Sequence, residues 1–198
     1  METDEVINGV LIKATQPKTG EPYVWPEGVT KIGDYAFAGW ENFNQPFSIP
    51  KSVTEIGHLV FSNWSKFNQP FSIPKSVTKI GNYAFANWHN FNQPFSIPKG
   101  VTKIGDSAFY NWYNFNQTFI IPKSVIQIKE YAFYNWNNFN QPNSRRAAVT
   151  SDWLRIDDWV FAGCYSGTLK QLRKRLDDGE STPAREKAWE SISQPFSR

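Results

Sequence analysis

Large apolar side chains recur along most of this chain at a fixed interval of 24 residues. Tryptophan holds one such position in five successive units, at Trp40, Trp64, Trp88, Trp112 and Trp136. Two phenylalanine series, which start at Phe37 and Phe43, and a proline series from Pro26 keep the same interval. A single unit buries too few apolar side chains to offset the entropy of ordering its backbone. The pattern therefore predicts a solenoid in which five units, residues 26–142, stack and bury one another's faces.

One full unit, residues 73–96, reads IPKSVTKIGNYAFANWHNFNQPFS, and its pattern predicts its local structure. Phe-Ser-Ile alternates and predicts a short strand, bracketed by prolines at positions that a strand tolerates. Val-Thr-Lys-Ile predicts a second extended piece, and Gly81 after it predicts a turn with unusual backbone angles. We expect the Asn-Tyr-Ala-Phe-Ala-Asn-Trp stretch to form a helical or 3₁₀ turn. We expect Asn92 and Gln93 to stack with their equivalents in ladders that satisfy backbone groups of the turns.

A solenoid exposes its terminal coils, so the two ends of the chain are expected to be caps. Residues 1–25 are the expected N-terminal cap. Residues 143–164 are expected to hold an insertion and a degenerate sixth repeat, in which Cys164 takes the tryptophan position. Residues 165–198 are the expected helical C-terminal cap. Its first helix would bury leucines and stop at Gly179, and its second would start at Thr182-Pro183.

Composition and charge narrow the function classes. The chain has 198 residues, a net charge of +3 and one cysteine, so it forms no intramolecular disulfide. This charge is well short of that of a dedicated nucleic-acid binder. The first residues lack the features of a secretory signal, and no stretch approaches the roughly 20 apolar residues of a membrane span. We expect a monomer in the cytoplasm, or one exported by a route independent of a signal peptide.

Catalytic chemistry is poorly supported by the sequence. The two histidines, His58 and His89, lie in different units and at different positions of the repeat. No CxxC pair, P-loop or dinucleotide fingerprint is present. Asp157-Asp158 is expected to be a turn, and Cys164 a small buried hydrophobe. The sequence therefore predicts a protein that is not an enzyme and that needs no metal and no cofactor.

Positions that differ between units are free of the task of holding a coil together. Tyrosine, which is enriched at binding hot spots, occupies several of these positions in the later units. Since neighbouring coils lie ~4.8 Å apart, the tyrosines are expected to cluster. The candidate partner-binding residues are Tyr110, Tyr113, Tyr134, His89 and Asn137. Drift at tolerant surface positions is the alternative interpretation.

A second candidate surface is a lysine column, with Lys79 and Lys103 close by. The column consists of Lys51, Lys75, Lys99 and Lys123. It could bind an anionic ligand: an acidic protein, a glycan, a phospholipid or a nucleic acid. Alternatively it is a solvated face that discourages side-on aggregation. The basic helix KQLRKR, residues 170–175, leaves a similar choice between contact with an anionic surface and a simple cap.

The repeat resembles the BspA-type leucine-rich repeat family, because IPKSVTKIGNYAF fits its pattern IP-x-x-V-x-x-I-G-x-x-A-F. The resemblance covers residues 8–164, and NGVLIK, residues 8–13, looks like the family's capping hairpin. Phenylalanine replaces leucine, tryptophan fills the family's cysteine position in five units, and each unit has one extra residue. The resemblance implies a right-handed β/α (β/3₁₀) solenoid of about six coils.

The family occurs on bacterial surfaces, in bacterial effectors and in protist parasites, so the resemblance implies protein or surface binding. It transfers no catalytic residues. We therefore predict a non-catalytic protein–protein interaction module, a bacterial effector or surface-type recognition protein. The alternative is a basic solenoid that binds an anionic glycan, membrane or nucleic acid through its lysine column, with nucleic acid the less favoured ligand.

Overall fold

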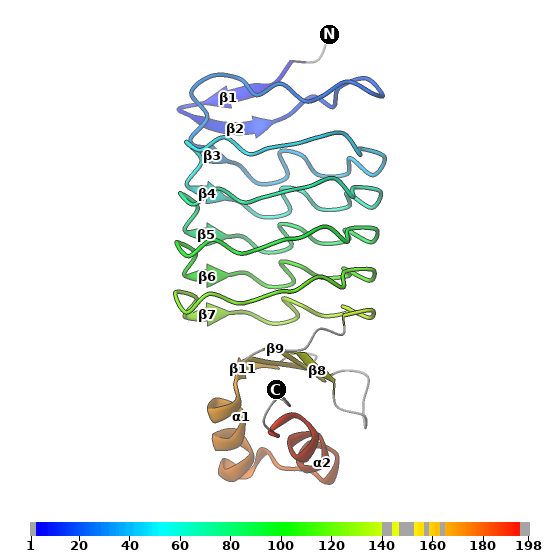
Figure 1. Ribbon diagram of the computed structural model, residues 1–198. Helices are drawn as coiled ribbons and strands as arrows, with labels where there is room; N and C mark the ends of the chain where they lie inside the picture. The colour runs from blue at the N-terminus through cyan, green and yellow to red at the C-terminus, as the bar shows by residue number, and fades with distance from the viewer. Residues whose placement is uncertain (1–2, 140–143, 147–152, 157–158, 163–164, 195–198) are drawn as a thin grey trace.

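Seven short strands form one sheet along the side of a stack of coils. The computed structural model describes residues 3–139, 144–146, 153–156, 159–162 and 165–194. The strands pair in chain order: β1 (Glu5–Ile7), β2 (Val10–Lys13), β3 (Lys31–Ile32), β4 (Glu55–Ile56), β5 (Lys79–Ile80), β6 (Lys103–Ile104) and β7 (Gln127–Ile128). Figure 1 shows β3 to β7 one above the other, one in each coil. The predicted repeat solenoid is confirmed. We number its coils I (26–49), II (50–73), III (74–97), IV (98–121) and V (122–139).

The strands form at Val-Thr-Lys-Ile, and not at Phe-Ser-Ile. Each pairs in parallel with its equivalent 24 residues away, as Lys79 does with Lys103. In coil II, Phe71 and Ile73 are buried and Ser72 is exposed, as the alternation predicts, but this segment forms no strand. Prolines flank the segment on both sides and lack the N–H that a ladder needs. We call the side of the stack formed by the strands the strand wall.

A second wall forms where the sequence predicts a helical turn. Alternate N–H groups of coil III donate to carbonyls of coil IV, through the bonds Tyr83–Asp106, Phe85–Ala108 and Asn87–Tyr110, each 2.8 Å long. The helical turn is therefore replaced by successive tight turns, because these N–H groups bond along the stack. Tyr83 and Asn87 have positive φ angles of 54° and 64°. We call this side the turn wall.

The repeated glycine has a different role from the one that the sequence predicts. None of its copies in the coils has a positive φ, which falls instead two residues later, at Tyr83 in coil III. What the position requires is close approach of neighbouring backbones. A Cβ placed on Gly105 would lie 2.6 Å from the backbone carbon of Gly81, closer than real Cβ atoms come.

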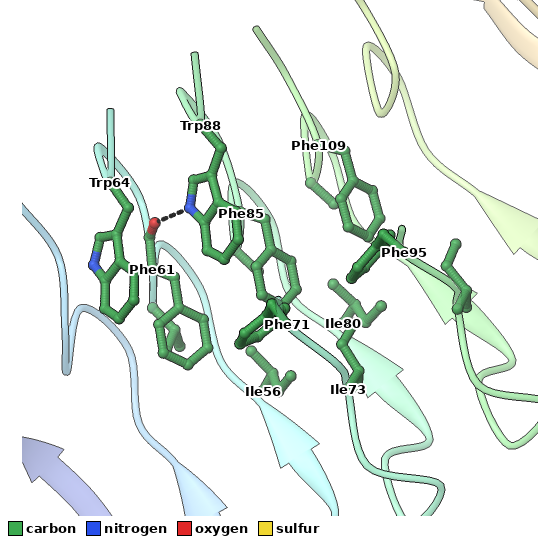
Figure 2. Packing of buried hydrophobic residues seen from close by; sticks show 14 of the residues in the cluster. Ile56, Phe61, Trp64, Phe71, Ile73, Ile80, Phe85, Trp88, Phe95 and Phe109 are labelled. Atoms are coloured by element: carbon green, nitrogen blue, oxygen red, sulfur yellow. Dashed lines mark hydrogen bonds between the residues drawn. The ribbon is translucent and has the colours of Figure 1, made fainter. Parts of the chain in front are cut away.

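The interior is a continuous column of aromatic and branched aliphatic side chains (Figure 2). Trp88 lies between Trp64 and Trp112, with ring centroids 5.8 and 5.6 Å apart and nearly parallel planes. Its indole Nε1 donates to the Phe61 carbonyl of the previous coil at 2.7 Å. The same bond recurs in each of coils II to V. The tryptophan column is therefore core, as the fixed period predicts.

Polar ladders satisfy backbone groups at the corners of the coils. The Asn92 N–H donates to Asn68 Oδ1 at 2.9 Å, and Gln93 Nε2 donates to the same oxygen at 3.3 Å, which confirms the predicted Asn and Gln ladders. His58 belongs to another ladder. Its Nδ1 accepts a hydrogen bond from the N–H of Asn82 at 2.8 Å, which requires an Nδ1 that carries no proton.

The N-terminal segment caps coil I as predicted. β1 and β2 form an antiparallel hairpin over the NGVLIK segment, with positive φ angles of 49° and 77° at Asn8 and Gly9. Tyr23 packs against the core, and its hydroxyl donates to Asp4 Oδ2 at 2.6 Å. Burial and the Asp4 carboxylate raise the pKa of Tyr23. The cap therefore covers the end of the aromatic column with a fixed, hydrogen-bonded ring.

The chain after coil V adopts a different architecture. A separate antiparallel sheet has the order β11 (Tyr165–Thr168), β10 (Trp159–Ala162), β9 (Trp153–Ile156), β8 (Ser144–Arg146). A sixth coil would have added a parallel strand beside β7, whereas β9 pairs antiparallel with β10. The structure thus differs from the predicted degenerate sixth repeat. Cys164 and Asp157-Asp158 lie outside the described residues.

Two helices follow this sheet, as the sequence predicts (Figure 1). α1 (Leu169–Arg175) runs into a wider turn, η1 (Leu176–Glu180), where Gly179 has a φ of 102°. α2 (Pro183–Ile192) starts at Thr182, whose hydroxyl accepts the Arg185 N–H at 3.3 Å. Among the described residues, neither helix has the length and hydropathy to cross a membrane.

The helices bury a small apolar cluster of their own, which consists of Leu172, Leu176 and Ile192 with Leu169 and Trp189 at its edge. The charges of the basic segment face outward or pair locally. Arg173 contacts Asp177 and Glu186, and its guanidinium lies 5.5 Å from the centre of the Trp189 ring. The leucines are therefore buried in a cluster separate from the core of the coils, and the choice between a cap and a contact with membrane or nucleic acid stays open for residues 170–175.

Candidate binding surface

Tyrosine rings from successive coils stack on the turn wall. Tyr110 and Tyr134 occupy the same position in coils IV and V, with centroids 5.8 Å apart and planes 10° from parallel. Tyr131 meets Tyr134 edge-on at 5.6 Å. The equivalent position holds the small, buried Ser62 in coil II and Ala86 in coil III. A ring at this position therefore adds outward bulk without a change in the core.

The second variable position carries a parallel stack. The rings of His89 and Tyr113 lie 4.9 Å apart with planes 26° from parallel. Asn137, at the same position in coil V, is exposed. Desolvation lowers the pKa of His89 below its ordinary value, which favours the neutral form of its ring. Neutral His89 suits a stack in contact with a tyrosine ring.

The two stacks lie close together. Burial raises the pKa of Tyr110, and the nearby phenol groups of Tyr113, Tyr134 and Tyr83 raise it further. We define the aromatic face as Tyr83, His89, Tyr110, Tyr113, Tyr131 and Tyr134. The predicted clustering of Tyr110, Tyr113 and Tyr134 is therefore observed, and their role in binding stays a prediction.

The sequence reasoning missed Tyr83 and Tyr131. They are 43% and 39% exposed, and both have a φ of 54°. Their position varies from coil to coil, with Leu59 in coil II and Ser107 in coil IV, so comparison of the units could have found them.

The segments that carry the aromatic face in coils III and IV have few ionic side chains, and those next to it are Asp106, which pairs with Lys129, and Glu130. Residues 82–98 and 107–121 contain no Asp, Glu, Lys or Arg. Coils I and II have Glu41 and Lys66 on the corresponding segment. An amide ladder runs beside the rings, in which Asn111 Nδ2 donates to Asn87 Oδ1 at 2.7 Å. Tyrosine with adaptable amides, and few charges, is the composition of protein recognition surfaces.

The lysine column lies at the turns that lead into the strand wall. Lys51, Lys75, Lys99 and Lys123 are all exposed. Four residues after Lys75 and Lys99, Lys79 and Lys103 begin β5 and β6 and lie directly opposite each other in the parallel pairing. The structure therefore separates the lysines, which lie on the strand wall, from the rings, which lie on the turn wall.

The histidines are not brought together. His58 is held in a structural ladder through Nδ1, and His89 stacks on Tyr113. Within the part of the chain that the structure describes, no three His, Cys, Asp or Glu residues gather in a way that could hold a metal ion. The site can therefore offer aromatic surface, amide and phenol hydrogen bonds, and separate lysine charges.

Comparison with known proteins identifies the family of the repeat. A model of the BspA type leucine rich repeat region matches residues 21–140 in six copies, and the match does not extend over residues 143–164. No curated protein matches the chain.

Solved structures of leucine-rich repeat proteins match part of the chain. A leucine-rich repeat protein of T. pallidum has 24% identity and a TM-score of 0.49, with 63% of this chain and 52% of that chain covered. One from Bacteroides ovatus has 24% identity and a TM-score of 0.42, with 55% and 33% covered. A leucine-rich cell surface protein of Faecalibacterium prausnitzii has 21% identity and a TM-score of 0.40, with 77% and 53% covered. The chain spans about half of these proteins or less.

Proposed function

Since the chain belongs to the BspA-type leucine-rich repeat family, we propose that it is a non-catalytic module that binds another protein through its aromatic face. Leucine-rich repeat proteins generally mediate binding or recognition. The observation that carries the proposal is the confinement of stacked, partly exposed tyrosines to coils III to V, where residues 107–121 contain no ionic side chain. We further propose a role in bacterial effector or surface-type recognition, which the repeat resemblance implies.

The energetics of a tyrosine surface support this function. Tyrosine supplies a large contact area at a low cost in conformational entropy, and its hydroxyl bonds to polar groups at the rim. Stacking on a neighbour fixes each ring before a partner arrives, so less entropy is lost on binding. The rings of Tyr110 and Tyr134 are prearranged in this way.

The test is affinity capture with the purified protein as bait, at low and at high salt, beside a Tyr110→Ala/Tyr134→Ala variant. A partner that the wild type holds at high salt and the variant loses supports the proposal. The matched control is Tyr35→Ala, which removes a 62% exposed tyrosine at the position of Tyr83, but in coil I, two coils before the aromatic face begins. Equal capture by all three proteins would contradict the proposal.

A second candidate function is binding to an anionic surface through the lysine column. The observation in its favour is that Lys51, Lys75, Lys99 and Lys123 are exposed and follow one another along the stack. Salt separates the two functions, because lysine-driven binding weakens steeply with added salt and tyrosine-driven binding does not.

A further inference from the structure

The coils differ in charge along the strand wall. Each coil has two positions there, one in the turn before the strand and one at the first residue of the strand. The pairs are Glu27 and Lys31, Lys51 and Glu55, Lys75 and Lys79, Lys99 and Lys103, and Lys123 and Gln127. Coils I and II are therefore neutral at these positions, coils III and IV carry two positive charges each, and coil V carries one. The positive charge is concentrated in coils III and IV, where both positions are lysine.

The first strand residues reveal the difference most directly. In coils I and II, Lys31 pairs with Glu55, with Nζ 3.5 Å from Oε2. In coils III and IV, Lys79 lies in the same register opposite Lys103. On its other side Lys79 is in register with Glu55, whose carboxylate pairs with Lys31. Two cations on neighbouring strands, ~4.8 Å apart, repel each other. Among the described residues, no carboxylate forms a salt bridge with either lysine.

We propose that the cationic quartet, defined as Lys75, Lys79, Lys99 and Lys103, binds an anionic polysaccharide that runs along the stack. This inference rests on the second candidate function and specifies its site and its ligand. A linear polymer fits because the two coils present their charges at a repeated spacing of ~4.8 Å, and Lys123 continues the line. Bound sulfate or carboxylate groups would relieve the repulsion between Lys79 and Lys103.

The residues around the quartet favour a polysaccharide over other polyanions. The segments 74–81 and 98–105 contain no aromatic residue, and proteins bind single-stranded nucleic acid by stacking its bases on aromatic rings. They also contain no arginine, whose fork suits phosphate. Thr78 and Thr102 are exposed between the lysines of coils III and IV, where a membrane-binding surface would present apolar groups; coil V differs, with the exposed Ile126 at this position.

The experiment measures binding of the whole protein to dextran sulfate and to polygalacturonate, with neutral dextran as the uncharged control. We expect binding to one or both anionic polymers and none to dextran. If four cations are engaged, affinity falls roughly 50-fold between about 50 and about 200 mM salt. The sulfated and carboxylated probes identify which acidic group the quartet prefers.

The key variant is Lys79→Glu, which places a carboxylate in register with Lys103 on one side and with Glu55 on the other. The new attraction and the new repulsion oppose each other, so thermal unfolding accompanies the binding measurement. We expect its affinity for the polymer to drop by about tenfold or more. The matched control is Lys66→Glu, which makes the same change in net charge at an exposed residue of coil II on the other wall. Its affinity should change by less than about twofold.

Four results would overturn the inference. Equal losses in both variants would mean that net charge alone drives binding, and an unchanged Lys79→Glu affinity would move the site elsewhere on the lysine column. Binding of oligothymidylate or of anionic lipid vesicles in preference to both polysaccharides would replace the ligand class. Absence of any polyanion binding would also remove the second candidate function.

Discussion

Coils I and II share their interior with coils III to V and differ from them on both walls. The Trp64 indole in coil II and the Trp112 indole in coil IV donate to phenylalanine carbonyls at 2.8 and 2.7 Å. On the walls, coil II has the buried Ser62 and the exposed Glu55 where coil IV has the partly exposed Tyr110 and the exposed Lys103. The turn wall thus becomes aromatic and the strand wall cationic in the same part of the chain.

This difference separates the residues that fold the protein from those that are free to bind. A position that is identical in every coil is required by the stack, as the tryptophan is. A position at which a coil functions with serine or alanine does not need tyrosine for folding. Each substitution that installs the residue of another coil is therefore a test of function at little cost in stability.

The largest expected effect falls on the shared interior, and it should be equal in the two regions. Trp64→Ala and Trp112→Ala each remove a fully buried ring and leave a phenylalanine carbonyl without its donor. We expect each to lose about 3–5 kcal/mol of unfolding free energy. Denaturant unfolding followed by circular dichroism measures both. A loss below about 1 kcal/mol in one of them would show that the interiors are not equivalent.

The next effect concerns the ladder that links coils II and III. His58→Leu removes the acceptor of the Asn82 N–H and should cost about 1–3 kcal/mol. His58→Asn should lose much less, because Asn82 plays the same part for Asp106 in the next coil, at 3.0 Å. Thermal unfolding of the two variants compares them. If both lose the same stability, the ladder bond contributes nothing.

A smaller effect is expected at the charge pair of the neutral region. Lys31→Ala breaks the exposed pair with Glu55 and should cost about 0.2–1 kcal/mol, an amount that shrinks at high salt. Lys103→Ala, in the cationic region, should instead be neutral or slightly stabilising, because it removes the repulsion with Lys79. Parallel urea titrations at low and high salt measure the two. The same sign for both would contradict the account of the strand wall.

The smallest effect is a pH dependence in the aromatic region. Burial lowers the folded-state pKa of His89 below its ordinary value, so the unfolded chain binds the proton first as pH falls. His89 therefore reduces stability as pH falls through the unfolded pKa of ~6.5 and toward its own lower pKa. His89→Gln should remove that part of the slope and leave the stability above pH 7 almost unchanged. Melting curves between about pH 5 and 8 detect the difference.

The repeat could be predicted from the sequence because one period governs every coil. The 24-residue period alone predicts that Trp88 lies in the core, that Asn and Gln form ladders at the corners and that Tyr110 lies beside Tyr134. The strand could not be located as easily, since Phe-Ser-Ile and Val-Thr-Lys-Ile both combine apolar and polar residues in patterns that suit an extended chain. Backbone hydrogen bonding between coils determines which segment forms the strand. Prolines beside Phe-Ser-Ile lack the N–H that such bonding needs, so the strand forms at Val-Thr-Lys-Ile.

The turn wall was harder to predict for another reason. A tyrosine with positive φ, such as Tyr83, is unfavourable in isolation and is imposed by bonds to the next coil. Local preference therefore indicated a helical turn. The architecture after coil V was not predicted because Ile156 and Phe161 repeat the spacing of the coils, whereas the strands that hold them, β9 and β10, pair antiparallel.

The most direct test of the central claim compares the wild type with Tyr110→Ala/Tyr113→Ser/Tyr134→Ala. Each change installs the residue found at the same position in coil II or III. The measurement is isothermal titration against the partner that capture identifies, together with thermal unfolding. The account predicts an affinity at least about 30-fold weaker, as expected from the loss of a hot spot, with folding intact. An affinity within about twofold of the wild type would contradict binding through the aromatic face.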